Sequence, residues 1–135
     1  TMYGGVVGSS QNADTKYIKC VNRGNITIDW HDAYTNTASA RQVYGVGGIV
    51  AISYGTFEEC ENYGNLWAKD GSAVHTRRYG GILGAAWPGS RSNQIDLIMT
   101  DCVNHGEIRH TAMYAGGIAG GVTNSKYVLI KGCGN

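Results

Sequence analysis

Among the residue types of this chain that could do chemistry, we consider the carboxylates first. Glycoside hydrolysis needs a pair of them, one as acid and one as base, on either side of a sugar bond. The densest group is Glu58, Glu59 and Glu61. Alternation along a strand would place Glu59 and Glu61 outside and Cys60 inside, so we expect this group to be a solvated edge. Residues 29–32, Asp-Trp-His-Asp, combine acids, a base and an aromatic ring, but no nucleophile lies at a defined spacing from them. The sequence predicts a loop motif there and favours a protein that is not an enzyme.

Cysteines and histidines could instead bind a metal or form disulfides. The cysteines lie about one repeat apart and form no paired zinc-ligand spacing with the histidines. The calcium-binding pattern Gly-Gly-x-Gly-x-Asp is absent as well, so no metal and no cofactor is predicted. Cysteines on stacked strands would lie about 4.8 Å apart with parallel side chains, which suit the disulfide dihedral badly. We expect free, buried thiols, with bridged cysteines as the alternative.

The cysteines belong to a repeated phrase, and the repeats are the elements that must position every candidate residue. A Gly-Gly-apolar string is followed by Cys-x-Asn-x-Gly and then Ile or Leu, and the last copy stops within the phrase. The constant residues are Cys20, Asn22 and Gly24; Cys60, Asn62 and Gly64; Cys102, Asn104 and Gly106; and Cys133 and Asn135. Repeats of this length indicate a stacked fold in which each repeat contacts its neighbours. We predict a single domain over residues 1–135, with repeats at about 3–46, 47–79, 80–115 and 116–135.

The pattern within the phrase indicates β-strands. Apolar and polar residues alternate from each Cys onward, and no 3.6-residue period is sustained. Large apolar residues precede each Cys by three positions and are expected to point inward: Tyr17, Phe57, Met99 and Ile130. We predict an all-β fold, a parallel β-helix or solenoid of about four coils with irregular loops. It is expected to be right-handed, because crossovers between parallel strands almost always are.

Glycine and asparagine have predicted structural roles in such a stack. The Gly that follows each Asn is expected at a corner where the backbone takes a positive φ. The Asn is expected to point inward and to hydrogen-bond the equivalent Asn above and below it. The Gly-Gly pairs are expected at a tight bend in which any Cβ would clash. The constant residues are therefore predicted to build the scaffold.

Composition excludes two classes of partner. The net charge of +1, with 16% charged residues, provides no basic surface for nucleic acid. No apolar run approaches the roughly 18 residues that span a bilayer, so no membrane insertion is expected.

A stacked fold ends in unpaired strand edges. Because the last repeat is broken, we expect a piece of a longer protein or a chain that associates end to end.

Aromatic side chains outside the inward positions are the candidate binding surface, because Tyr and Trp suit contacts to sugars and proteins. They are Trp30, Tyr34, Tyr44, Tyr54, Tyr63, Trp67, Trp87 and Tyr114. Trp87, beside Pro88-Gly89 in a long loop, is the strongest candidate, because loops on one face of a solenoid tend to carry binding. Trp30, Tyr34 and Trp67 are the other candidate ligand-contacting residues.

Residues 79–84, Tyr-Gly-Gly-Ile-Leu-Gly, followed by the phrase at 102–108, resemble the GLUG-type repeat. The resemblance covers nearly the whole chain, with Ala51 replacing the third Gly in one copy. This repeat occurs in large secreted or surface-bound bacterial proteins, including adhesins. The resemblance implies a non-catalytic structural or adhesive module at the cell surface or outside the cell, with a protein or glycan ligand. The alternatives are a filament subunit joined head to tail through its open ends, and a β-helix that binds or processes carbohydrate.

Overall fold

The computed structural model describes residues 2–10, 12–28, 45–68, 78–87, 95–109, 114–123 and 125–135. Within these residues the fold is all-β, with strands β1 to β17 and no helix. Every strand pair that the structure describes is parallel. The predicted all-β class is confirmed, and the parallel sheets fit a β-solenoid in general.

The strands recur in the same order along the chain, and each recurrence is called a rung. The first rung contains β1 (Met2–Gly4), β2 (Val7–Ser9), β3 (Lys16–Ile18), β4 (Val21–Asn22) and β5 (Ile26–Ile28). The second contains β6 (Gly45–Gly47), β7 (Val50–Ile52), β8 (Gly55–Glu58), β9 (Glu61–Asn62) and β10 (Leu66–Ala68). The third contains β11 (Arg78–Gly80), β12 (Leu83–Ala85), β13 (Asp96–Thr100), β14 (Val103–Asn104) and β15 (Ile108–Arg109). The last contains β16 (Tyr114–Gly116) and β17 (Tyr127–Lys131).

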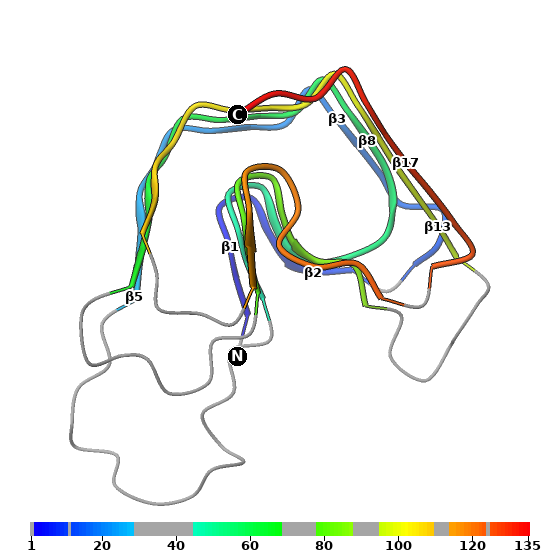
Figure 1. Cartoon of the computed structure of the whole chain (residues 1–135), viewed down its shortest axis with the longest axis horizontal. Helices are drawn as coiled ribbons and strands as arrows, with labels where there is room; N and C mark the ends of the chain where they lie inside the picture. The colour runs from blue at the N-terminus through cyan, green and yellow to red at the C-terminus, as the bar shows by residue number, and fades with distance from the viewer. Residues whose placement is uncertain are drawn as a thin grey trace, which may run out of the picture.

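Equivalent strands of successive rungs pair to form the sheets. Two sheets have the strand orders β1-β6-β11-β16 and β3-β8-β13-β17. Three shorter sheets have the orders β2-β7-β12, β4-β9-β14 and β5-β10-β15. Viewed down the short axis, the rungs overlie one another, and the bend from β1 to β2 lies inside the arc formed by β3 to β5 (Figure 1). The Gly-Gly bends therefore face the inner side of β4 and β5.

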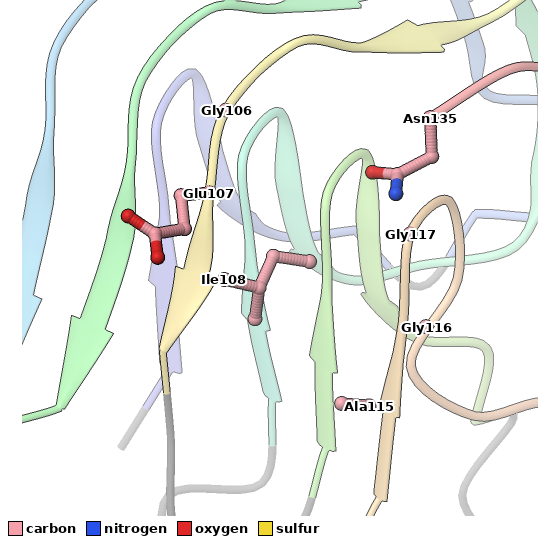
Figure 2. Close-up of a pocket in the computed structure, with 7 residues that line it drawn as sticks. All are labelled: Gly106, Glu107, Ile108, Ala115, Gly116, Gly117 and Asn135. Atoms are coloured by element: carbon pink, nitrogen blue, oxygen red, sulfur yellow. The ribbon is translucent and has the colours of Figure 1, made fainter.

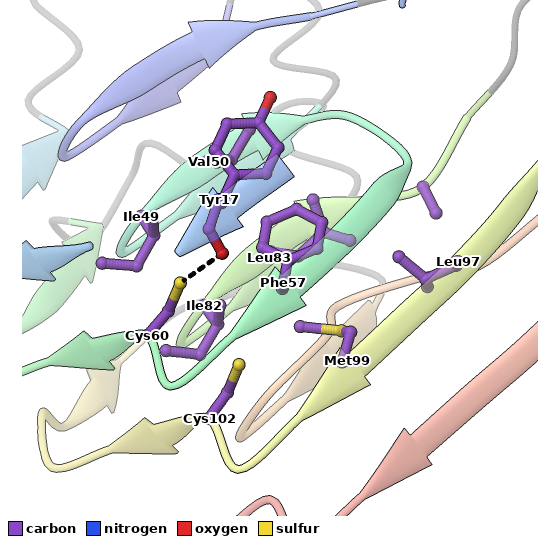
Figure 3. Close-up of a cluster of buried hydrophobic side chains, with 11 residues drawn as sticks. Tyr17, Ile49, Val50, Phe57, Cys60, Ile82, Leu83, Leu97, Met99 and Cys102 are labelled. Atoms are coloured by element: carbon purple, nitrogen blue, oxygen red, sulfur yellow. Dashed lines mark hydrogen bonds between the residues drawn. The ribbon is translucent and has the colours of Figure 1, made fainter. Parts of the chain in front are cut away.

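The main core lies between the β2-β7-β12 sheet and the β3-β8-β13 strands (Figure 3). Phe57 and Met99 are fully buried, and Tyr17 is nearly so. The Tyr17 ring stacks on Phe57 with 4.6 Å between ring centroids. The prediction that the residue three before each Cys points inward is confirmed for these three rungs. Ile130 pairs in register with Met99 but is 45% exposed, because β17 is an edge strand and the described residues cover Ile130 from one side only.

The cysteines form an inward column beside this core, and all four are free thiols, as predicted. Cys60 and Cys102 are fully buried, whereas Cys20 and Cys133 are partly buried. The Cys60 thiol donates to the Tyr17 carbonyl oxygen of the first rung at 3.3 Å (Figure 3). Burial raises the pKa of the Cys20 thiol. The hydrogen bond with Cys60, together with burial, raises the pKa of the Cys102 thiol.

The positive φ predicted for the Gly after each Asn is wrong. Left-handed backbone occurs instead at the exposed residue before each Cys: Lys19 (53°), Glu59 (50°), Asp101 (53°) and Gly132 (66°). Glycine is required after Asn62 and after Asn104 for another reason, since a Cβ at Gly64 would lie 1.9 Å from the Gly24 carbonyl oxygen. A Cβ at Gly106 would lie 2.0 Å from the Gly64 carbonyl oxygen in the same way. At Gly64 and Gly106, glycine allows neighbouring rungs to approach, whereas a Cβ at Gly24 would approach only Asn22 Oδ1, at 3.7 Å. None of these three glycines has a positive φ.

Candidate functional site

The asparagines of the repeated phrase form a hydrogen-bonded ladder through the stack. Asn22 Nδ2 donates to Asn62 Oδ1 at 2.8 Å, and Asn62 Nδ2 donates to Asn104 Oδ1 at 2.7 Å. Asn104 Nδ2 then donates to Asn135 Oδ1 at 2.5 Å. The first three amides also donate at 2.8 Å to the carbonyl oxygen two residues later: Gly24, Gly64 and Gly106. The predicted asparagine ladder is confirmed, and each amide both links two rungs and closes its own corner.

The Gly-Gly bends pack directly against this ladder. A Cβ at Gly48 would lie 2.3 Å from Asn62 Cγ. Within the bend itself, a Cβ at Gly47 would lie 1.9 Å from the Val50 carbonyl oxygen. The predicted clash at the bend is confirmed. The contact between the two halves of the repeated phrase, Gly-Gly and Cys-x-Asn, was not predicted from their spacing.

Residues that vary between repeats point away from the ladder and form a surface that we call the outer face. It follows the outer side of β4, β5, β9, β10, β14 and β15 and the corners between them. Its members are exposed or partly buried: Arg23, Thr27, Glu61, Tyr63, Asn65, Trp67, His105, Glu107 and Arg109. Because equivalent residues are in register, side chains about 40 positions apart in sequence come into contact on this face.

One such contact is a column of Arg23, Tyr63 and His105. The Arg23 guanidinium lies 4.8 Å from the centre of the Tyr63 ring, and the His105 ring stacks on Tyr63 with centroids 4.4 Å apart and planes 13° apart. Tyr63 donates a hydrogen bond to the Glu61 carboxylate, which raises the pKa of Tyr63. His105 Nε2 lies 3.6 Å from the same carboxylate. Since its neighbours above and below occupy both faces of the Tyr63 ring, this ring supports the column and is closed to stacking by a ligand.

Trp67 lies in a more open position on the outer face. It pairs in register with Thr27 on one side and Arg109 on the other, and it is 36% exposed. The Arg109 guanidinium lies 5.7 Å from the Trp67 ring, and Arg109 Nε donates to Glu107 Oε1 at 2.7 Å. Because Thr27 is small, the opposite side of the indole has no large described neighbour in register. An indole beside a cation and a carboxylate suits contact with a sugar ring or a peptide.

Two of the other predicted surface aromatics, Trp87 and Tyr54, do not join this face. Trp87 is exposed and follows β12, which belongs to a different sheet from Trp67. Tyr54, between β7 and β8, is 1% exposed, so its assignment to the surface was wrong. Trp30, Tyr34, Tyr44 and the whole of segment 29–32 lie outside the described residues.

The predicted acidic group at 58–61 is a solvated edge. Glu58 and Glu59 are exposed and Glu61 is partly exposed, and Glu59 pairs with Lys19 at 3.4 Å. Within the residues that the structure describes, no group of three or more His, Cys, Asp or Glu side chains is placed to hold a metal ion. In the same part of the chain, no helix has the length and apolar character that crossing a membrane requires.

Comparison with known proteins adds no assignment to these observations. No protein-family model matches the chain, and neither a curated protein nor a solved structure matches it. The fold and the outer face are therefore the basis on which function is inferred.

Proposed function

We propose that this chain is a non-catalytic structural repeat module with an adhesive outer face, from an extracellular or cell-surface bacterial protein of the GLUG-repeat type. In this proposal the sheets form a right-handed β-helix of about four coils. The observation that carries it is the separation of two sets of residues. The constant residues of the repeat make contacts inside the stack, whereas the variable residues form the outer face.

The inner contacts support a structural role. Each rung is joined to the next by parallel backbone pairing, by the asparagine ladder and by close glycine contacts. Nearest-neighbour contacts of this kind let a stack extend by whole rungs without a change in any one of them. Such a module suits a stalk that holds a contact surface at a distance from its point of attachment.

The outer face supports an adhesive role, and Trp67 is its best candidate contact residue. Its ring is partly exposed, one side is held by Arg109, and Glu107 fixes that arginine in turn. A held aromatic ring loses little conformational freedom when it contacts a ligand. The ligand class that fits is a glycan or a protein surface.

Binding to a glycan array, with the full chain as probe, tests the adhesive role. We expect Trp67→Ala to weaken the best glycan signal by about tenfold or more, because central aromatic contacts carry a large part of binding energy. Trp87→Ala is the matched control, since Trp87 is equally exposed and follows β12, a strand of a different sheet. If Trp87→Ala abolished binding and Trp67→Ala did not, the contact would lie on the loop. A chain that binds no glycan and no host-cell surface would contradict the adhesive role.

A filament subunit is the second candidate, because both ends of the stack carry exposed apolar side chains. Val6, which corresponds to the fully buried Ile49 of the next rung, is 48% exposed at one end, and Ile130 on β17, which pairs with the fully buried Met99, is 45% exposed at the other. Unpaired parallel edges of this kind can recruit another chain. Electron microscopy and sedimentation at rising concentration test it: end-to-end oligomers are expected, and a single monomeric species throughout would exclude the filament.

A further inference from the structure

Two columns of side chains run along the outer side of the β5-β10-β15 sheet, with one member of each column in each of its rungs. One column consists of residues in register: Thr27, Trp67 and Arg109. The other lies two positions earlier in each rung and consists of Asn25, Asn65 and Glu107. The Glu107 and Ile108 side chains project to opposite sides of the chain, and Glu107 lies on the outer face (Figure 2). Because residues two positions apart share one face of a strand, the two columns lie side by side.

Backbone hydrogen bonds fix the direction of the two asparagine amides. Asn25 Oδ1 accepts from the Asn65 N–H at 2.9 Å, and Asn65 Oδ1 accepts from the Glu107 N–H at 2.9 Å. Each amide oxygen is therefore used by the next rung, and each Nδ2 group is left as a donor. Among the described residues, neither Nδ2 group has an acceptor. Asn25 is exposed and Asn65 partly exposed, so the outer face presents two oriented donors.

Trp67 has a long neighbour on one side of its column and a short one on the other. The Arg109 guanidinium lies 5.7 Å from the indole ring, whereas Thr27 is the residue in register on the other side. In the neighbouring column, Arg23 and His105 lie on the two faces of Tyr63. We call the side of the indole toward Thr27 its open side. Both neighbours of Trp67 in its column are described residues, so the open side follows from the small size of Thr27.

The polar groups nearest the open side carry no charge. They are the Thr27 hydroxyl and the amides of Asn25 and Asn65. The charged pair of these columns lies on the other side of Trp67 and is internally neutralised, since Arg109 Nε donates to Glu107 Oε1 at 2.7 Å. An aromatic face with a few uncharged hydrogen-bonding groups fits a neutral ring that has an apolar face and a polar rim. A carboxylate or phosphate would lose hydration there without gaining a free cation.

We propose that the open side of Trp67 binds an uncharged pyranose ring of a glycan. The C–H face of the sugar stacks on the indole, its hydroxyl oxygens accept from the Asn25 and Asn65 amides, and one hydroxyl donates to the Thr27 oxygen. This inference rests on the proposed function for the contact at Trp67, and it goes further by naming the ligand class. Acidic glycans and peptides are the ligand classes that it rejects.

The probes are the methyl glycosides of glucose, galactose and mannose, each paired with the uronate that carries a carboxylate in place of the C6 hydroxymethyl group. They are titrated into the full chain labelled with ¹⁵N, to about 10 mM, since single-sugar contacts are expected at millimolar affinity. We expect at least one neutral glycoside to shift the Trp67 indole N–H and the side-chain amides of Asn25 and Asn65. Its uronate should bind about fivefold more weakly or not at all.

Two substitutions at Thr27 test the open side itself. Thr27→Phe places a ring beside the indole and should weaken binding of the neutral glycoside about tenfold or more. Thr27→Val is the matched control, because it keeps the size of threonine and loses only the hydroxyl, and it should weaken binding less than about threefold. Position 27 is exposed, and both new residues favour strands. Asn25→Asp keeps an oxygen for the Asn65 N–H and removes the donor, so it should weaken binding about fivefold.

Three results would overturn the inference: no shift at Trp67 with any neutral glycoside, a uronate that binds as well as its neutral partner, or undiminished binding by Thr27→Phe. If Thr27→Phe fails to fold, the uronate comparison on the unchanged chain still decides. An acidic glycan or a peptide that binds at Trp67 when no neutral sugar does would support the adhesive role and overturn this inference. Neutral-sugar shifts at Trp67 in a chain that adheres to no glycan array and no host-cell surface would do the reverse.

Discussion

The middle rungs and the end rungs carry the same repeat positions but bury them to different extents. Phe57 and Met99 are fully buried in the second and third rungs, whereas Ile130 in the last rung is 45% exposed. Cys60 and Cys102 are likewise buried, whereas Cys20 and Cys133 are only partly so. The repeat position sets the direction of a side chain, and the neighbouring rungs set its burial. Stability should therefore be concentrated in the second and third rungs.

Gly64→Ala should cause the largest loss of stability among substitutions that compare the same repeat position in a middle rung and an end rung. Its Cβ would lie 1.9 Å from the Gly24 carbonyl oxygen, and the rungs would have to separate to accept it. We expect the free energy of unfolding in urea to fall by more than about 4 kcal/mol. Gly24→Ala in the first rung is the matched control, because a Cβ there approaches only Asn22 Oδ1, at 3.7 Å. Similar losses in the two variants would contradict the comparison.

Phe57→Ala should cause the next largest loss of stability. The Phe57 side chain is fully buried and stacks on Tyr17, so its removal leaves a cavity and costs about 3 to 4 kcal/mol. Ile130→Ala, at the equivalent position of the last rung, should cost less than about 1 kcal/mol because the side chain is already half in water. Thermal unfolding followed by circular dichroism measures both. A larger decrease in melting temperature for Ile130→Ala than for Phe57→Ala would contradict the concentration of stability in the middle rungs.

Asn62→Ala should sharpen the same comparison for a polar position. Asn62 bonds to the equivalent amides in both neighbouring rungs, and its removal leaves buried polar groups without these partners, at a cost of about 2 kcal/mol. Asn22→Ala removes a bond to one neighbouring amide and should cost about half as much. Hydrogen exchange at Gly24 and Gly64 provides a local readout. Faster exchange at Gly64 in Asn62→Ala is expected because the Gly64 N–H donates to Asn62 Oδ1, and no change there would argue against this corner contact.

Alkaline pH should have the smallest effect on the free energy of unfolding. The pKa of Cys20 is raised above 9.0 in the folded chain, by burial first and then by the neighbouring Cys60. The unfolded chain therefore loses this proton at lower pH, so the stabilising contribution is complete below about pH 9 and is lost as pH rises further. One thiol accounts for at most about 1.4 kcal/mol per pH unit. Urea unfolding between pH 8 and 10 measures this decline in the free energy of unfolding, and Cys20→Ala should reduce it. An unchanged decline in this variant would assign it to other groups.

Much of the scaffold could be predicted because the repeat displays each position several times. Asn22, Asn62 and Asn104 share one place in the phrase, so their inward ladder follows from stacking alone. The position of the left-handed residue was missed because Lys19, Glu59 and Asp101 are not glycine, and nothing in their residue types indicates a positive φ. The role of Gly64 was misassigned because a steric contact with the rung below has no local signal.

The outer face was only partly predictable. Trp67 was selected as an exposed aromatic, but its contact with Arg109 depends on the register between strands about 40 residues apart. Arg23, Tyr63 and His105 occupy the same place between Asn and Gly in three repeats. This shared position predicts that the three side chains stack into a column, and the prediction comes from the variable residues of the repeat and not from its constant ones.

The sequence by itself determined the parallel β class, the inward direction of Cys and Asn, and the need for a tight Gly-Gly bend. Alternation and repeat period are properties of a single strand or turn, and they can be read without knowledge of a neighbour. Only the tertiary structure decided which rungs are buried, which glycines have no room for a side chain, and which outer side chains stack. Those properties depend on the distance and register between rungs, and they exist only once the rungs are assembled.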